Sequence, residues 1–335
     1  MKFKNVLITG GSGYCGSVLT PQLLDVGHQV TVYDIQYYGS DFLPKDNPNL
    51  KVVKGDIRDV EHLARELEGI DAVLHLACIS NDASFVLDEK LSTSVNLDAF
   101  EPMVIAAKDA GVKRFIYAST SSVYGVSDEP DVTEDHPQLP LTLYNEFKGL
   151  CEPRLFKHTD ENFVGVAFRP ATVCGYGPRQ RLDVSVNILT NHAVNKGKIT
   201  VFGGSQLRPN LHIQDYVDLC KLMLDAPDEK IADDVFNCGF QNMSIMEIAE
   251  VVKKVVQEEF PERGELEIVT TPSDDNRSYH INSDKIKRVL GFEPQHSIEE
   301  AVRDLCQAFR DGKLPDSFDD DGYYNVRTMQ AIGAE

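Results

Sequence analysis

A glycine-rich segment at residues 9–16 constrains this chain more than any other feature, because the apolar run 6–8 leads directly into it and a helical pattern follows. This order predicts a strand, a glycine turn and the start of a helix. Glycines at positions 10, 13 and 16 permit a tight turn, bring peptide N–H groups close to a diphosphate and let the helix pack against the strand. The positive end of the helix dipole would favour an anion at the same place. Taken alone, the pattern also fits an ordinary glycine turn, so its surroundings have to decide.

The sequence after this turn favours a dinucleotide site. Apolar residues at 19–24 continue the helix, Gly27 can end it, and residues 29–33 form a second predicted strand that stops at Asp34. An acidic side chain about 20 residues after the glycines can bind the ribose hydroxyls of NAD and would repel the additional phosphate of NADP. A polar strand end without a ligand is the alternative for Asp34. We therefore predict NAD as the cofactor.

The composition indicates a globular chain and argues against several classes of partner. The 335 residues suffice for a large α/β domain with a smaller lobe or for two ordinary domains, and no apolar run approaches the ~20 residues of a membrane span. A net charge of −20 argues against nucleic acid and anionic membranes as partners. The N-terminus leads directly into a predicted core strand, which leaves no room for a signal peptide. The seven cysteines include no C-x-x-C pair, so we expect no metal site, no disulfides and a cytoplasmic location.

Strands and helices alternate along the first half of the chain. Strands are expected at residues 51–54, 71–77, 113–118 and 163–168, with helices at 60–67 and 99–111. This alternation predicts right-handed β-α-β units in a doubly wound parallel sheet, a Rossmann-type α/β fold. Asp56 follows the third strand, where its carboxylate could meet an adenine amino group or cap the next helix.

Two polar signals follow near the carboxyl edge of this sheet, where open α/β folds bind their ligands. A row of hydroxyls at residues 119–122 comes directly after the fifth strand, and Tyr144 and Lys148 lie further on, at an expected helix start. Positions i and i+4 share one face of a helix, so the phenol and the ammonium should point into the same space. Hydroxyl rows often only form turns, and this tyrosine–lysine spacing is common by chance. The hydroxyl row and the tyrosine–lysine pair favour a functional site because both follow a dinucleotide-type glycine turn in the sequence.

The glycine turn, the hydroxyl row and the pair Tyr144 and Lys148 together resemble the short-chain dehydrogenase/reductase superfamily. The length and the later arginines resemble its extended branch of sugar-nucleotide epimerases and dehydratases, over about residues 3–310. The resemblance implies Thr120, Tyr144 and Lys148 as catalytic residues, with Thr120 chosen because it lies five residues before Gly125. The cofactor-binding residues that it implies are Gly10, Gly13, Tyr14, Cys15, Gly16, Asp34, Asp56, Ile57, Leu76, Ala77, Asn96, Tyr144, Lys148, Arg169 and Pro170.

The resemblance also implies a redox mechanism. A tyrosine with a pKa near ~10 is a weak base at neutral pH, and Lys148 together with the positive nicotinamide ring would favour its phenolate. Thr120 would hold a sugar hydroxyl while Tyr144 takes its proton and a hydride passes to NAD, which leaves a keto sugar. Return of the hydride to the opposite face gives an epimerase, and release of the ketone gives a dehydrogenase. Loss of water is disfavoured, because family dehydratases carry an Asp-Glu pair where this chain has Ser121 and Ser122.

Arginines recur in the second half of this acidic chain. Arg179 and Arg181 lie beside a glycine-proline turn, and Arg208 and Arg277 come later. Guanidinium groups bind phosphate oxygens bidentately, so the set suggests a diphosphate site, although each arginine alone also fits a solvated surface charge. The resemblance adds that Arg208 and Arg277 clamp a nucleotide diphosphate and that Asn187 contacts its phosphate or base. The candidate substrate-binding residues are Ser80, Ser121, Thr172, Arg179, Arg181, Asn187, Arg208 and Arg277.

The chain is predicted to form two interleaved lobes and a tail. Residues 1–178 and about 212–240 would form the NAD-binding lobe, and about 179–211 and 241–311 a smaller α/β lobe for the nucleotide sugar. Residues 312–335 include three consecutive aspartates and are expected to be an irregular acidic tail, with a subunit contact as the alternative. By the habit of the family that the chain resembles, helices at 88–110 and 144–158 would form the four-helix interface of a homodimer.

Together these features predict an NAD-dependent epimerase of a nucleotide-diphosphate sugar, similar to UDP-glucose 4-epimerases, with a transient 4-keto intermediate. A 4-dehydrogenase, a 4-ketoreductase or a dehydratase of a similar substrate is the alternative, and a non-catalytic NAD-sensing protein is a further one. The chain departs from many 4-epimerases at Thr172, where they carry Asn, and at Asn145, Glu146 and Phe147, between the tyrosine and the lysine. These departures leave the nucleotide base and the sugar of the substrate undetermined.

Overall fold

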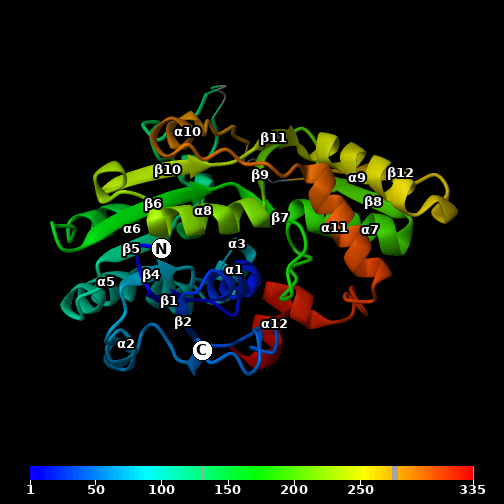
Figure 1. Cartoon of the computed structure of the whole chain (residues 1–335). Coiled ribbons are helices and arrows are strands. Elements are labelled where there is room, and N and C mark those ends of the chain that lie inside the picture. Colours follow the sequence, from blue (N-terminus) through cyan, green and yellow to red (C-terminus); the bar gives the residue numbers. More distant parts are fainter. Residues whose placement is uncertain (81, 128, 130, 274–277, 335) are drawn as a thin grey trace.

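The central layer of the protein is a seven-stranded sheet in which every neighbouring pair is parallel (Figure 1). The computed structural model describes residues 1–80, 82–127, 129, 131–273 and 278–334. The strands of this sheet are β1 (Asn5–Thr9), β2 (Gln29–Asp34), β3 (Leu50–Lys54), β4 (Ala72–His75), β5 (Arg114–Ala118), β6 (Val164–Pro170) and β10 (Asp234–Cys238). Their spatial order is β10-β6-β5-β4-β1-β2-β3, so the direction of winding reverses between β1 and β4. Ligands of such sheets bind at the carboxyl ends of the strands at this switch point.

Both faces of the sheet are covered by helices, which confirms the predicted Rossmann-type doubly wound fold. On β1, Val6 and Ile8 belong to the hydrophobic core on one face and Leu7 to the core on the other face. A strand that is buried on both faces is apolar throughout, which is why residues 6–8 could be recognised from the sequence. The covering helices are α1 (Tyr14–Asp25), α8 (Ile213–Asp225) and α10 (Asp284–Leu290) on one face, and α2 (Val60–Glu66), α5 (Phe100–Asp109) and α6 (Leu143–Phe156) on the other.

The expected helix over 88–110 is present, but it consists of three successive helical segments. These are α4 (Glu89–Thr93), a π-helical turn (Ser94–Asp98) and α5. Asn96 lies in the π-helical turn, and its side chain both donates to and accepts from the backbone of Ile79 at 2.9 Å. The extra residue of a π-turn directs this amide inward, where it satisfies the two backbone groups of Ile79.

A smaller lobe is interleaved with the sheet and has its own hydrophobic core. Its strands are β7 (Thr172–Cys174), β8 (Lys198–Phe202), β9 (Leu207–His212), β11 (Gln241–Ser244) and β12 (Glu267–Thr271), in one three-stranded and one two-stranded sheet. Its helices are α7 (Ser185–Lys196), α9 (Ile245–Glu259) and α11 (Ile298–Arg310), which pack around a shared core. The chain enters β10 of the main sheet between β9 and β11, so the two lobes are not consecutive in sequence. The exact lobe boundaries stay a prediction.

The C-terminal residues are not an irregular tail, and this expectation is wrong. A 3-10 turn (Asp321–Tyr323) leads into α12 (Asn325–Ile332), which packs against α3 (Asp82–Phe85) and is red in Figure 1. Met329 is 4% exposed and packs with Ile79 and Leu91. The helix forms because it has this tertiary surface to cover, which the acidic local sequence does not reveal. The remaining short elements are the 3-10 turns Ser121–Tyr124, Asp228–Lys230 and Pro261–Arg263.

Two further observations concern the cysteines and the helices. All seven cysteines are free thiols, and five of them are buried. Within the described ranges, no three His, Cys, Asp or Glu side chains are grouped as metal ligands. The helices of the same ranges are all too short or too polar to span a bilayer.

Candidate functional site

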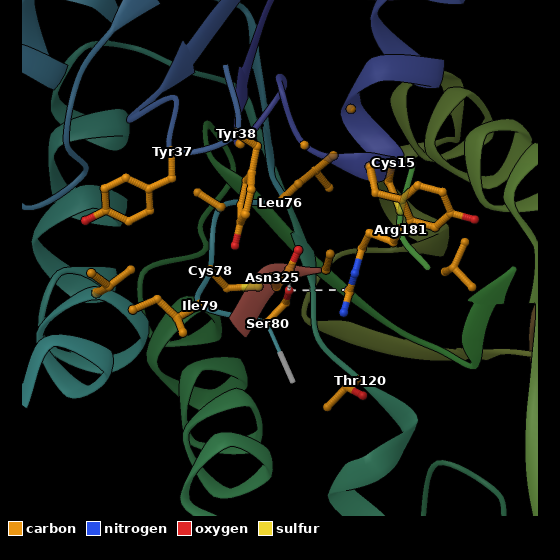
Figure 2. A pocket seen from close by; sticks show the side chains of 18 of the residues that line it. Cys15, Tyr37, Tyr38, Leu76, Cys78, Ile79, Ser80, Thr120, Arg181 and Asn325 are labelled. Atoms are coloured by element: carbon orange, nitrogen blue, oxygen red, sulfur yellow. Dashed lines mark hydrogen bonds between the residues drawn. The ribbon is translucent and has the colours of Figure 1, made fainter. Parts of the chain in front are cut away.

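A cavity of about 370 Å³ lies at the carboxyl end of the parallel sheet (Figure 2). Its walls come from the ends of β1, β2, β4, β5 and β6, from the start of α6, from residues 179–184 and from α12. Most of the predicted site residues line it: Gly10, Gly13, Tyr14, Cys15, Gly16, Asp34, Asp56, Ile57, Leu76, Ala77, Ser80, Thr120, Tyr144, Lys148, Pro170, Thr172, Arg179 and Arg181.

The glycine turn lets the backbone of α1 form one wall of this cavity. Gly10 has φ +75°, and a Cβ there would lie 2.6 Å from the backbone nitrogen of Ala77. A Cβ on Gly16 would lie 2.5 Å from the carbonyl oxygen of Gly11, so neither position accepts a side chain. Gly13 is the N-cap of α1 and has no side chain to cover the helix end. The first-turn N–H groups of α1 therefore face a space that fits a diphosphate.

Asp34 ends β2 on the same wall and is held by two backbone hydrogen bonds. Its Oδ2 accepts from the Ser12 nitrogen at 2.9 Å, and its Oδ1 accepts from the Gln36 nitrogen at 2.7 Å. Burial raises the pKa of Asp34, and these two hydrogen bonds act in the opposite direction. The carboxylate is thereby fixed at the position where the glycine motif predicts a ribose-binding acid.

Asp56 lies at the far end of this wall, after β3. Burial disfavours its ionised form, yet the hydrogen bonds from Arg58 outweigh burial and lower the pKa of Asp56. The Arg58 guanidinium contacts its Oδ2 at 2.6 Å. Its carboxylate is thus an ionised acceptor at the edge of the cavity.

Thr120, Tyr144 and Lys148 meet on the opposite side of the cavity. Thr120 follows β5, and its Oγ1 accepts from the Ser122 nitrogen at 3.2 Å. Tyr144 and Lys148 lie one turn apart on α6, whose first turn is capped by the hydroxyl of Thr142. The Lys148 Nζ donates to the Ala118 carbonyl at 2.7 Å and is almost fully buried. The helix thus directs a phenol and an ammonium into one space, as the i, i+4 spacing predicts.

Burial and the neighbouring charged side chains set the pKa of Tyr144. Burial raises the pKa of Tyr144 well above its ordinary value, Cys78 and Asp82 add to the rise, and Arg181 lowers it. The Arg181 Nη1 donates to Ser80 Oγ at 3.4 Å, the contact drawn in Figure 2. Its Nη2 is buried and has no hydrogen-bond partner among the described residues. A buried guanidinium nitrogen of this kind can accept an anionic ligand or an oxygen of a bound sugar.

Arg179 faces the Asp34 side of the cavity. Its guanidinium stacks 3.8 Å from the ring centre of Tyr38, and its Nη2 donates to Asn325 Oδ1 at 2.6 Å. Burial and the positive charge of Arg181 together lower the pKa of Arg179 to about 10, and Asp34 is among the groups that favour its charged form. Arg179 thus lies beside Tyr38 and Asp34 as well as beside Arg181, and its role as a substrate-binding residue stays a prediction.

A second cavity of about 320 Å³ adjoins the first one. Ser122, Thr172, Asp183 and Val184 line both cavities, so the two are continuous. Arg208, from β9, lines only the second. Ile188, Leu189, His192 and Phe202 of its wall come from the smaller lobe, and Tyr279 belongs to the core of the main sheet.

Four predicted site residues are buried outside both cavities. Asn187 donates to Tyr14 Oη at 3.2 Å and accepts from the Gly175 nitrogen at 3.0 Å, so its amide supports the wall beside α1. Arg169 is buried against Glu152, with Nη2 and Oε2 2.6 Å apart. Asn96 holds the backbone of Ile79, as described above. The four residues are Asn96, Ser121, Arg169 and Asn187; Arg277 lies outside the described residues.

Several residues of the walls were missed by the sequence analysis. They are Tyr37, Tyr38, Cys78, Ile79, Asp82, Val95, Asp183, Asn325 and Met329, among others. Asp183 follows the arginine turn directly and could have been included with it. Asn325 and Met329 gave no local signal, because only the folded chain brings α12 to the cavity.

The fold and the glycine wall define a dinucleotide-binding protein in which a second cavity adjoins the dinucleotide site. Residues 6–239 match the NAD dependent epimerase/dehydratase family, and the chain belongs to this family. The glycine wall and Asp34 fit a dinucleotide, and NAD is the cofactor.

The relatives of the chain include enzymes of different reaction types. It is 29% identical over 310 residues to a UDP-glucose 4-epimerase of Lactobacillus helveticus, with 87% of this chain and 92% of the relative covered. It is also 29% identical over 325 residues to a dTDP-D-glucose 4,6-dehydratase of Mus musculus, with 92% and 89% covered. Among solved structures, MoeE5 in complex with UDP-glucuronic acid and NAD is 28% identical and superimposes with a TM-score of 0.78, over 92% of this chain and 99% of MoeE5. These comparisons define an NAD-dependent sugar-nucleotide enzyme class but leave the reaction open.

Proposed function

We propose that this chain interconverts two nucleotide-diphosphate sugars that differ in configuration at C4, through a transient 4-keto sugar. The observation that supports this most is that Thr120, Tyr144 and Lys148 share one cavity with the glycine wall of α1. Bound NAD supplies a hydride acceptor that can later return the hydride. Return of the hydride to one face or the other of C4 gives the two epimers, and NAD ends in the oxidation state in which it began.

In this proposal Tyr144 removes the proton of the C4 hydroxyl. Its phenol has a raised pKa in the protein, so the positive charges of Arg181 and Lys148 have to favour the phenolate during the reaction. Lys148 is suited to this because its ammonium is buried and held by the Ala118 carbonyl, where water screens its charge little. Thr120 would orient the same hydroxyl by a hydrogen bond.

The second cavity would hold the nucleotide diphosphate. Arg208 lines it and can contact phosphate oxygens, and Asp183 and Thr172 connect it with the first cavity. The L. helveticus relative is named for UDP-glucose and MoeE5 was solved with UDP-glucuronic acid, so a uridine nucleotide is our first expectation.

A dehydratase is the second candidate, because one carboxylate of the cavity has no established use in the epimerase proposal. Asp34, Asp56 and Asp183 line the first cavity but are engaged with backbone amides or arginines. Asp82 also lines it, accepts from Thr142 Oγ1 at 2.5 Å and raises the pKa of Tyr144. Loss of water needs such an additional acid, although Ser121 and Ser122 occupy the usual positions of the acidic pair.

The test is to incubate the purified protein with UDP-, GDP-, CDP- and dTDP-hexoses and with UDP-glucuronic acid. An epimerase gives a C4 epimer in the NMR spectrum, and the absorbance of reduced nicotinamide does not accumulate. NADH formation in step with substrate identifies a dehydrogenase instead, and a 4-keto-6-deoxy product identifies a dehydratase. No turnover of any sugar, with NAD bound, favours the non-catalytic alternative.

The variant Tyr144→Phe separates catalysis from binding. It should abolish turnover and still bind NAD, because the phenol oxygen contributes to the chemistry and not to the glycine wall. Tyr176→Phe is the matched control, since Tyr176 lines neither cavity. Full activity of Tyr144→Phe would refute the mechanism.

A further inference from the structure

We infer that the C-terminal segment 321–334 is a wall of the NAD site and that Asn325 is the positioning residue that holds this segment against the cavity. The inference rests on NAD as the cofactor and is independent of the reaction that the sugar undergoes. Asn325 and Met329 line the cavity that the α1 glycines and Asp34 also line. Figure 2 shows Asn325 beside Ser80 and Arg181, across from Thr120.

Asn325 joins three segments that lie far apart in the sequence. It is 2% exposed, and its backbone nitrogen donates to Asp183 Oδ2 at 2.9 Å. Its Nδ2 donates to Ser80 Oγ at 3.0 Å, and its Oδ1 accepts from the Arg179 guanidinium at 2.6 Å. The bond from the Asn325 nitrogen to Asp183 caps the N-terminus of α12 with a carboxylate from another segment. One side chain thus fixes the start of α12 to the loop after β4 and to the arginine turn.

Arg179 connects this contact with the cofactor side of the cavity. Its guanidinium lies between Asn325 and the ring of Tyr38 and is 2% exposed. If α12 moved away, the Nη2 of a buried cation would lose its acceptor, which is costly in a weakly solvated site. The charged network therefore favours the closed position of the segment.

Apolar contacts hold the other end of the segment. Met329 and Ala334 pack with Ile79 and Leu91, and Ile79 itself lines the cavity. The Leu182 nitrogen also donates to the Tyr323 carbonyl at 2.9 Å, immediately before α12. The segment is consequently fixed before, at and after Asn325.

These contacts have a consequence for the dinucleotide. A ligand in this cavity is bounded by α1 on one side and by α12 on another, so we infer that the ligand leaves when the wall formed by α12 loosens. The contacts of Asn325 and Met329 are lost in that step and add to the barrier for release. Weakening either contact should accelerate release of the cofactor.

The test measures cofactor release in the full-length protein. Protein preloaded with NADH is mixed with excess NAD in a stopped-flow instrument, and the loss of NADH fluorescence gives the release rate. Asn325→Ala and Met329→Ala should each release NADH about tenfold faster, the effect of one lost charge-assisted or buried apolar contact. Gln330→Ala is the matched control, because Gln330 is exposed on the same helix.

A second measurement uses the unaltered protein, so that a variant that fails to fold does not decide the outcome. Backbone amides of residues 325–332 should exchange with deuterium more slowly when NAD is bound. Unchanged release in both folded variants, or equal acceleration in Gln330→Ala, would overturn the inference. Deuterium exchange of the α12 amides at the same rate with and without NAD would also overturn it. So would variants in which only the KM for the sugar substrate changes.

Discussion

The Nε of Arg181 lies 2.8 Å from Asp183 Oδ1, at the boundary where the two cavities meet. Burial opposes ionisation of Asp183, but the charge and hydrogen bond of Arg181 keep the pKa of this carboxyl below its ordinary value. Arg181 also lowers the pKa of Tyr144. One guanidinium thus holds Asp183 at the junction of the two cavities and supplies positive charge to the candidate base.

The pH dependence of the reaction should report this charge. Arg181→Gln removes a group that lowers the pKa of Tyr144, so the phenolate should form only at higher pH. We expect the acidic limb of the kcat/KM profile to move up by about one pH unit, with about tenfold lower activity at neutral pH. A profile measured between pH 5 and 10 checks this. Lower activity with an unmoved limb would mean that Arg181 acts only on the structure.

Asp34 should determine the choice of dinucleotide. Asp34→Asn keeps an oxygen acceptor but removes the charge that repels a ribose phosphate, and it disturbs the bonds from Ser12 and Gln36. We expect about tenfold weaker binding of NADH and a relative gain for NADPH. Fluorescence titration with both dinucleotides measures the ratio. Asp59→Asn, at the N-cap of α2, is the control, and an unchanged ratio in Asp34→Asn contradicts the assignment.

The buried ion pair of Arg169 and Glu152 should contribute more to the stability of the fold than to the affinity for NAD. Both side chains are 4% exposed, and the Ser119 hydroxyl also donates to Glu152 at 2.6 Å. Glu152→Ala leaves a buried cation without its partner, which costs about 3–5 kcal/mol of unfolding free energy. Urea unfolding checks this value. The exposed pair of Lys287 and Glu293 is the control, because removing it should cost less than about 1 kcal/mol. If Glu152→Ala is as stable as the parent protein but binds NAD more weakly, Arg169 has to be assigned to cofactor binding instead.

The first half of the fold could be predicted because its signals are local. Strands such as β1 and β4 are buried on both faces, so three consecutive residues of each are apolar, and the glycine turn follows β1 directly. The position of Tyr144 beside Lys148 follows from helical spacing alone. Each of these inferences needs only neighbouring residues.

The misses depend on contacts between distant residues. β9 pairs with β7 and β11 and is only partly apolar, so its strand character comes from its partners. Asn187 lies on α7, and its partner Tyr14 lies 173 positions earlier in the chain. Asn325 likewise depends on Ser80 and Asp183. No periodicity in a single sequence contains such pairings.

The subunit arrangement can be tested through an exposed apolar stripe. Leu143 and Leu150 on α6 are 39% and 41% exposed, and Ile105 on the adjoining α5 is 41% exposed. Large apolar groups aligned on two packed helices are typical of a surface that another subunit covers, so we expect a homodimer of twice 37.3 kDa. Leu150→Asp should yield monomers in sedimentation experiments, because a symmetric interface would bury both introduced carboxylates. Val26→Asp, an exposed apolar position at the end of α1, is the control and should leave the mass unchanged. A monomeric parent protein at micromolar concentration would contradict the prediction, and so would a Leu150→Asp variant that sediments as the dimer.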